Sequence, residues 1–286
     1  MPDSDRDFIL SMQCPDRPGI LARVTGALND RGGDVRDAIS FGDDETRIFF
    51  IRVHLQLPSD AAETAFREDM GGIAEDLGIE WQMQDWRRKS RVLIAVSKSD
   101  HCLVHLLHRW KVGSLNIEIP AVVSNHETTR DYVEWQGIPY HYLPVTKETK
   151  PAQEKALAEL IEELKIDLVV LARYMQVLSP WMCEWLYGRC INIHHSFLPS
   201  FKGARPYHKA HERGVKLIGA TAHYVTTNLD EGPIIEQDVR RVSHATTTDE
   251  MVAIGREIEA NVLARAVRWH TEHRVQLNGQ KTVVFA

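Results

Sequence analysis

Strongly apolar segments alternate with amphipathic ones through most of the chain after residue 90, and this alternation restricts the fold more than any other feature. We predict strands over 91–97, 121–126, 139–145, 166–174, 189–194 and 220–226, helices over 101–111, 152–165 and 248–274, and a terminal strand over 281–286. Near-continuous apolar strands separated by helices are typical of a parallel sheet that is covered on both faces. The sequence therefore predicts an α/β domain with a mostly parallel, Rossmann-like sheet.

The first part of the chain has a different pattern, in which strands and helices follow the order βαββαβ. The predicted strands are 8–14, 34–42, 46–57 and 79–86, with one helix starting near Pro18 and a second over 59–77. This order predicts an α+β domain, with a four-stranded antiparallel sheet and two helices on one face. We interpret the basic run WRRKSR as a linker, which divides the chain into residues 1–85, 86–91 and 92–286.

Composition and charge argue against several classes of protein. The net charge is −6, whereas nucleic-acid binding proteins carry a basic surplus. No apolar run approaches the roughly 20 residues of a membrane span. The N-terminus, MPDSDRDF, is acidic where a signal peptide is basic, so we expect a cytoplasmic protein. The four cysteines form no C-x-x-C pair, which indicates reduced structural thiols.

Three histidines, His101, His105 and His108, share one face of the predicted helix 101–111. A zinc site would also need ligands from another element, and no such set is visible in the sequence. We therefore expect no metal.

The segment CPDRPGILARV resembles the start of an ACT domain, a small module that often binds amino acids at subunit interfaces. The resemblance implies an effector site at Asp16, Pro18, Gly19 and Ile20, because Gly19 lets backbone N–H groups approach a carboxylate. ACT domains commonly have Asn-Ile after the glycines, whereas this chain has Asp-Val at 34–35. A dimerisation module without a ligand is therefore at least an equal alternative. We expect a homo-oligomer in either case.

Polar residues gather where the predicted strand 189–194 ends. Asn192 and His194 lie at its carboxyl end, where open α/β sheets bind their ligands. A second segment, GATAHYVTTNLDEGPIIEQ, contains His223 and a turn with Asp230. Asparagine can hold a developing oxyanion, histidine can transfer a proton near neutral pH, and aspartate can orient the histidine or a water molecule. This set suits transfer of an acyl group to an acceptor or to water.

The segments INIHHSFLPSFKGARPYHKA and GATAHYVTTNLDEGPIIEQ resemble the two signatures of the formyltransferase family, whose members use 10-formyltetrahydrofolate. In that family an Asn, a His two residues later and a distant Asp are catalytic, which implies these roles for Asn192, His194 and Asp230. The resemblance also implies a pterin site at 175–178 and 228–232. We therefore expect substrate binding by residues of these two segments and by two histidines that neighbour the catalytic group. These residues are Met175, Gln176, Val177, Leu178, Asn228 and Gly232, together with His195 and His223.

Four residues follow the catalytic strand, namely Lys202, Arg205, Tyr207 and His208. They are expected to meet the glutamate tail of the folate or to hold the loop, with a solvated position favoured for Lys202. His195, beside His194, either holds a water molecule or points into the sheet.

An ACT-like domain joined to a formyltransferase-type domain resembles the formyltetrahydrofolate deformylase family, as do the phrases SKSDHCL and VLARYMQVLSP. The resemblance implies hydrolysis of 10-formyltetrahydrofolate to formate and tetrahydrofolate without a cofactor, which balances one-carbon pools and supplies formate for purine synthesis. The turn at 97–101 agrees, because it lacks the glycines whose backbone N–H groups cradle an acceptor's phosphate. Two alternatives are a transferase with another amine acceptor and a regulatory amino-acid-binding protein with an inactive catalytic domain.

Overall fold

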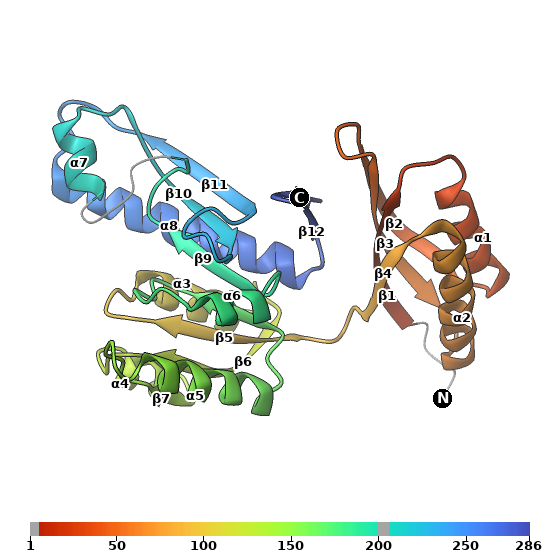
Figure 1. Ribbon diagram of the computed structural model, residues 1–286, viewed down its shortest axis with the longest axis horizontal. Coiled ribbons are helices and arrows are strands. Elements are labelled where there is room, and N and C mark those ends of the chain that lie inside the picture. The colour runs from red at the N-terminus through yellow and green to blue at the C-terminus, as the bar shows by residue number, and fades with distance from the viewer. Residues whose placement is uncertain (1–5, 200–205) are drawn as a thin grey trace. The chain divides into compact units, whose positions relative to one another are not determined.

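The structure is a computed structural model that describes residues 6–199 and 206–286 (Figure 1). The chain separates into two compact units. The first contains the residues up to Lys89 together with Glu272–Asn278 and Val283–Ala286, and the second contains Ser90–Thr271 and Gly279–Thr282. None of the helices in the described part of the chain combines the length and apolar character that a membrane crossing requires.

The first unit is an antiparallel sheet with two helices. Its strands are β1 (Arg6–Pro15), β2 (Asp34–Asp43), β3 (Ile48–Leu57) and β4 (Glu80–Asp85), in the order β2-β3-β1-β4, and its helices are α1 (Ile20–Asp30) and α2 (Asp60–Leu77). Alternate residues of β1 and β3 pack with the apolar stripes of both helices in one core. The predicted βαββαβ order and ACT-like fold are confirmed.

The end of the chain returns to this first sheet. The buried Arg52 of β3 donates hydrogen bonds from Nε to the carbonyl oxygen of His273 at 3.2 Å and from Nη2 to that of Glu272 at 3.1 Å. Gln276 and Asn278 add hydrogen bonds to the Ile51 carbonyl and to Asp43. The final helix, predicted to reach residue 274, ends at residue 271 and is followed by a hairpin, of which only the second strand was predicted.

The second unit contains a seven-stranded sheet in the order β11-β10-β9-β8-β5-β6-β7. The five strands from β9 to β7 run parallel, and β10 pairs antiparallel with both of its neighbours, β9 and β11. The predicted mostly parallel sheet is therefore confirmed. The strands are β5 (Ser90–Val96), β6 (Ile117–Ser124), β7 (Tyr140–Tyr142), β8 (Leu168–Leu171), β9 (Cys190–His194), β10 (Leu217–Tyr224) and β11 (Ile234–Arg241). The strand predicted over 166–174 was too long, because the backbone turns at Arg173, whose φ is 62°.

Helices cover both faces of this sheet. Residues of α5 (Lys150–Glu163) and α6 (Pro180–Trp185) share a core with alternate residues of β5 and β8. The long helix α8 (Thr248–Thr271) lies along β9, β10 and β11 and also packs against α3 (His101–Lys111) (Figure 1). The remaining helices are α4 (Arg130–Trp135) and α7 (Pro206–Glu212), and the C-terminal hairpin consists of β12 (Val275–Asn278) and β13 (Lys281–Val284). The strand order reverses at β5, so the carboxyl ends of β5, β8 and β9 meet at one edge.

Candidate active site

The antiparallel pairing of β9 with β10 places three polar side chains on one face of the sheet. His223 lies directly opposite Asn192 in the register, and His194 is two residues further along β9. Residues two apart on a strand, and residues directly opposite each other on neighbouring strands, point to the same face. Consistent with this, Asn192 Nδ2 lies 3.3 Å from His223 Nε2. The two signature segments therefore form one site.

Asp230 completes the group from the turn that follows β10. Its Oδ1 atom lies 3.2 Å from His194 Nδ1 and 3.8 Å from His223 Nε2. Asp230 has a φ of 58°, in the left-handed region that aspartate tolerates better than most residues. Gly232 is required nearby, because a Cβ atom there would lie 1.8 Å from the carbonyl oxygen of Tyr224. The shape of this turn thus directs the carboxylate back towards the sheet.

Hydrogen bonds fix the protonation of His223 and the orientation of Asn192. His223 Nδ1 lies 2.9 Å from the carbonyl oxygen of Tyr224, and because a carbonyl oxygen can only accept, Nδ1 carries a proton. Burial lowers the pKa of His223, so the ring is neutral near physiological pH and Nε2 has a lone pair. The amide nitrogen of Asn192 donates to this lone pair. His223 therefore positions the asparagine.

His194 and Asp230 form a directed acid–base pair. The hydrogen bond from His194 holds the pKa of the Asp230 carboxyl below its usual range, although partial burial acts in the opposite direction. The ionised carboxylate accepts a hydrogen bond from Nδ1–H and so leaves Nε2 of His194 for chemistry. Among the described residues, this buried Nε2 atom has no hydrogen-bond partner. An imidazole held in this way can accept or donate a proton at one defined atom.

A cavity of about 370 Å³ lies beside the acid–base pair. Met175, Val177 and Leu229 line it and are 62%, 56% and 59% exposed, although they are apolar. Apolar walls with a few convergent polar groups are typical of a site for an organic ligand. The cavity contains every residue that was predicted for catalysis or substrate binding except Gly232: Met175, Gln176, Val177, Leu178, Asn192, His194, His195, His223, Asn228 and Asp230. Their individual roles remain predictions.

Arg173, which was not predicted from the sequence, also lines the cavity. Its Nη1 atom lies 2.8 Å from Nδ1 of His195, and the ring of His195 stacks on that of His194 with centroids 4.8 Å apart. Arg173 follows the buried strand β8 at the same carboxyl edge as His194. Since polar residues at that edge were used to find the site, the same rule applied to β8 would have identified this arginine.

Glu259 was also missed, and it anchors Arg173 from α8. The Glu259 side chain is 2% exposed, with Oε2 at 3.4 Å from Arg173 Nε and 2.9 Å from His101 Nε2. Its Oε1 accepts a hydrogen bond of 2.7 Å from the Tyr207 hydroxyl. Burial would raise the pKa of Glu259, but the hydrogen bond from His101, the charge of Arg173 and the other polar contacts hold it below its ordinary value. A carboxylate between apolar residues on a helix, as in IEANVL, was the available signal.

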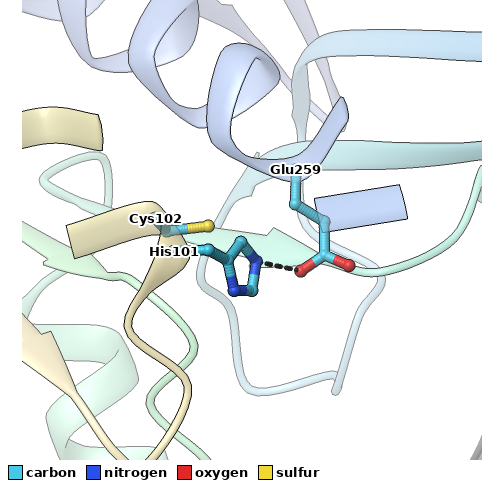
Figure 2. A group of neighbouring side chains, drawn as sticks. All are labelled: His101, Cys102 and Glu259. Carbon is cyan, nitrogen blue, oxygen red and sulfur yellow. Dashed lines mark hydrogen bonds and ion pairs between the residues drawn. The ribbon is translucent and has the colours of Figure 1, made fainter. Parts of the chain in front are cut away.

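Three members of this region could be taken for a metal site. Figure 2 shows His101, Cys102 and Glu259, whose ligand atoms all lie within 4.8 Å of one another. Burial, and then the nearby Glu259 carboxylate, raise the pKa of the Cys102 thiol, so no thiolate forms near neutral pH. The Glu259 carboxylate already accepts from two side chains and faces a guanidinium. We interpret the group as a hydrogen-bond network.

The other histidines of α3 lie apart from this network. His105 accepts a hydrogen bond of 2.7 Å from Arg109 Nε, and burial lowers the pKa of its ring. Of the residues that follow β9, Tyr207 is turned inward to Glu259, whereas His208 is exposed. Lys202 and Arg205 lie outside the described residues.

The predicted effector residues surround the first turn of α1. Gly19 precedes the helix with a φ of 88°, as the turn requires, and the Asp16 backbone N–H donates to the carbonyl oxygen of Arg47 at 2.8 Å. Pro18 is exposed, but the side chain of Ile20 is 1% exposed and belongs to the core of the first unit. Only its backbone is placed to meet a ligand, and effector binding remains a prediction.

Comparison with known proteins agrees with both units. Residues 90–267 match the formyl transferase family, and residues 8–68 match the ACT domain family. Over 280 residues the chain is 48% identical to a protein from a Corynebacterium species named formyltetrahydrofolate deformylase, covering 97% of each chain.

Solved structures give the same result. The crystal structure of formyltetrahydrofolate deformylase from Burkholderia mallei is 47% identical, with a TM-score of 0.94 over 98% of this chain and 100% of that chain. Glycinamide ribonucleotide transformylase 1 from Symbiobacterium toebii is 28% identical, with a TM-score of 0.65 over 69% of this chain and 95% of that one. On the strength of the full-length matches, this chain belongs to the formyltetrahydrofolate deformylase family.

Proposed function

We propose that this protein is a hydrolase that converts 10-formyltetrahydrofolate to formate and tetrahydrofolate. Its full-length relatives are named for this activity. The observation that carries the proposal is the His194–Asp230 pair, which lies with Asn192 at the wall of a cavity with apolar sides. This arrangement provides acid–base and oxyanion-stabilising groups without requiring a covalent intermediate. The reaction balances one-carbon pools and supplies formate for purine synthesis.

In the proposed mechanism, Asp230 and His194 align a water molecule against the formyl carbon. As the water oxygen bonds to that carbon, Nε2 of His194 takes one proton from the water. The amide of Asn192, held by His223, and the resulting protonated His194 then stabilise the oxyanion. One such donor contributes about 2.7–4 kcal/mol to transition-state stabilisation. His194 then delivers a proton to N10 as the bond between the formyl carbon and N10 breaks. The second proton of the water leaves as formic acid ionises.

We further propose that the pterin ring lies against residues 175–178 and 228–232, where the apolar side chains of Met175, Val177 and Leu229 are exposed. The mechanism uses only protein side chains and water, so we propose that no cofactor takes part. The division into an ACT-like part, a linker and a catalytic part, an amino-acid effector and a homo-oligomer remain proposals. The free, buried state of all four cysteines supports a reducing compartment such as the cytoplasm.

The experiment that tests the function is turnover without any amine. Purified protein is mixed with 10-formyltetrahydrofolate, tetrahydrofolate is followed by absorbance, and formate is measured with a coupled enzyme assay. We expect formate and tetrahydrofolate in equal amounts. Turnover that requires an added amine acceptor would instead identify a transferase, and the proposal of hydrolysis would be wrong.

A further inference from the structure

A formyl-transfer site must admit an amine acceptor, whereas in a hydrolytic site water reaches the formyl carbon instead. The transformylase from Symbiobacterium toebii, which shares this fold over 69% of this chain, is named for a glycinamide ribonucleotide. In this chain the pair His194–Asp230 lies beside the cavity. Some feature near this pair must therefore decide which nucleophile reaches the formyl carbon.

The surroundings of His194 show where an acceptor is blocked. Asp230 binds the ring at its edge through Nδ1, and His195 covers one face of the ring, with an interplanar angle of 20°. The guanidinium of Arg173 in turn contacts His195 Nδ1. A guanidinium can only donate hydrogen bonds, so this nitrogen of His195 accepts and carries no proton. Arg173 and His195 thus form one wall of the cavity.

Buried groups on the side of Arg173 away from His195 hold this wall in place. Arg173 is 17% exposed and faces Glu259, which is itself fixed by His101 and Tyr207. Tyr207 reaches Glu259 only because residue 255 is glycine, where a Cβ atom would lie 2.1 Å from the tyrosine ring and hydroxyl. Three helices of the second unit, α3, α7 and α8, therefore contribute to fixing one guanidinium. The hydrogen bonds from His101 and Tyr207 fix the Glu259 carboxylate, which holds Arg173 through charge, because Arg173 Nε has no hydrogen-bond partner among the described residues.

The backbone of Arg173 would accept glycine without strain. Its φ of 62° lies in the left-handed region, where glycine is unstrained and a side chain is not. Replacing Arg173 by glycine therefore removes the guanidinium without straining the turn.

We propose that Arg173, locked by Glu259 and His195, closes the site to amine acceptors, so that water is the nucleophile that reaches the formyl carbon. The inference rests on the proposed hydrolysis. Removing the guanidinium opens a second reaction, in which an amine nitrogen bonds to the formyl carbon, the bond to N10 breaks, and the amine proton passes to N10.

The test uses Arg173→Gly in the full chain, with glycinamide as a small primary amine. Formate, tetrahydrofolate and N-formylglycinamide are measured together, the last by mass spectrometry. For the wild type we expect formate to equal tetrahydrofolate at every amine concentration. For Arg173→Gly the share of formyl groups found on the amine should rise at least roughly tenfold, the lower end of the discrimination that a shaped pocket provides.

Lys165→Gly is the matched control, since Lys165 is an exposed residue with a φ of 50° and lies at the end of α5 outside the cavity. It should give the wild-type product ratio. Arg173→Lys retains the positive charge facing Glu259 but has a shorter donor group, so it should fold and show a smaller rise. A folded Arg173 variant without formylated amine above the wild-type amount would overturn the proposal, and so would wild-type protein that already formylates glycinamide. A wild type that releases no formate without amine would instead refute the proposed hydrolysis.

Discussion

Replacing Asp230 by asparagine removes one negative charge from the site while keeping the size of the side chain. The ionised carboxylate accepts a single hydrogen bond from His194 Nδ1, at 3.2 Å. A hydrogen bond to a charged group contributes about 1.5–3 kcal/mol. If Asp230 acts only through His194, Asp230→Asn should therefore lower kcat/KM by roughly 10- to 150-fold, at about 1.4 kcal/mol per factor of ten. Because 3.2 Å is long for a charge-assisted bond, the lower half of this range is expected for that role alone.

A larger loss would mean that the carboxylate also aligns the water. The assay is formate release without amine, together with calorimetric binding of tetrahydrofolate, which should change less than about threefold because the carboxylate acts on the transition state. Asp238→Asn serves as the control, since Asp238 is an ion-paired aspartate of β11 that does not line the cavity. A loss of kcat/KM below about threefold, or a loss of affinity as large as the loss of rate, would refute the roles given to Asp230.

Three further predictions concern positioning and stability. His223→Phe should lower kcat by roughly 2- to 12-fold with little change in KM, because Asn192 loses an acceptor worth about 0.5–1.5 kcal/mol. Steady-state kinetics would show this loss, and an unchanged kcat would contradict it. Gly232→Ala should lower the free energy of unfolding by at least about 1–3 kcal/mol in urea titrations, because the new Cβ atom overpacks the turn. Gly71→Ala in α2 is the control and should not destabilise the protein, because a Cβ atom there meets no atom within 4 Å. The pKa of Glu259 is lower in the folded protein than its ordinary value. Its ionised carboxylate therefore stabilises the fold above the unfolded pKa, and this stabilisation is lost as the pH falls through the folded pKa. Tm measured against pH should fall more steeply on the acid side for the wild type than for Glu259→Gln, and parallel curves would refute this.

Much of the fold followed from patterns within the sequence. The apolar runs at 91–97 and 189–194 became β5 and β9 within two residues at either end, because buried parallel strands require such runs. The rule that ligands bind at the carboxyl ends of strands located Asn192 and His194. An aspartate in a turn is ordinarily a turn residue, so Asp230 joined the set for its chemistry beside Asn192 and His194, and the resemblance then implied its catalytic role.

Long-range contacts explain what the sequence did not predict. The meeting of Arg173 with Glu259 depends on a left-handed backbone residue and on helix packing, and no local pattern encodes either. The C-terminal hairpin did have a local signal, because Gly279 lies between VQL and TVV, and glycine is typical of a two-residue hairpin turn, which here is formed by residues 279–280. Its attachment to the first sheet depends on Arg52, a charged residue within a strand, whose partners are backbone carbonyl groups.

The return of the chain end to the first sheet has a consequence for the evolution of this architecture. The ACT-like module is built from segments that are far apart in the sequence, so a single gene fusion at the linker would not exchange the whole module for another. A chain that begins at Ser90 would leave Gln276 and Asn278 without their partners at Ile51 and Asp43. Recombination that exchanges this module would have to replace two separate stretches of the gene together.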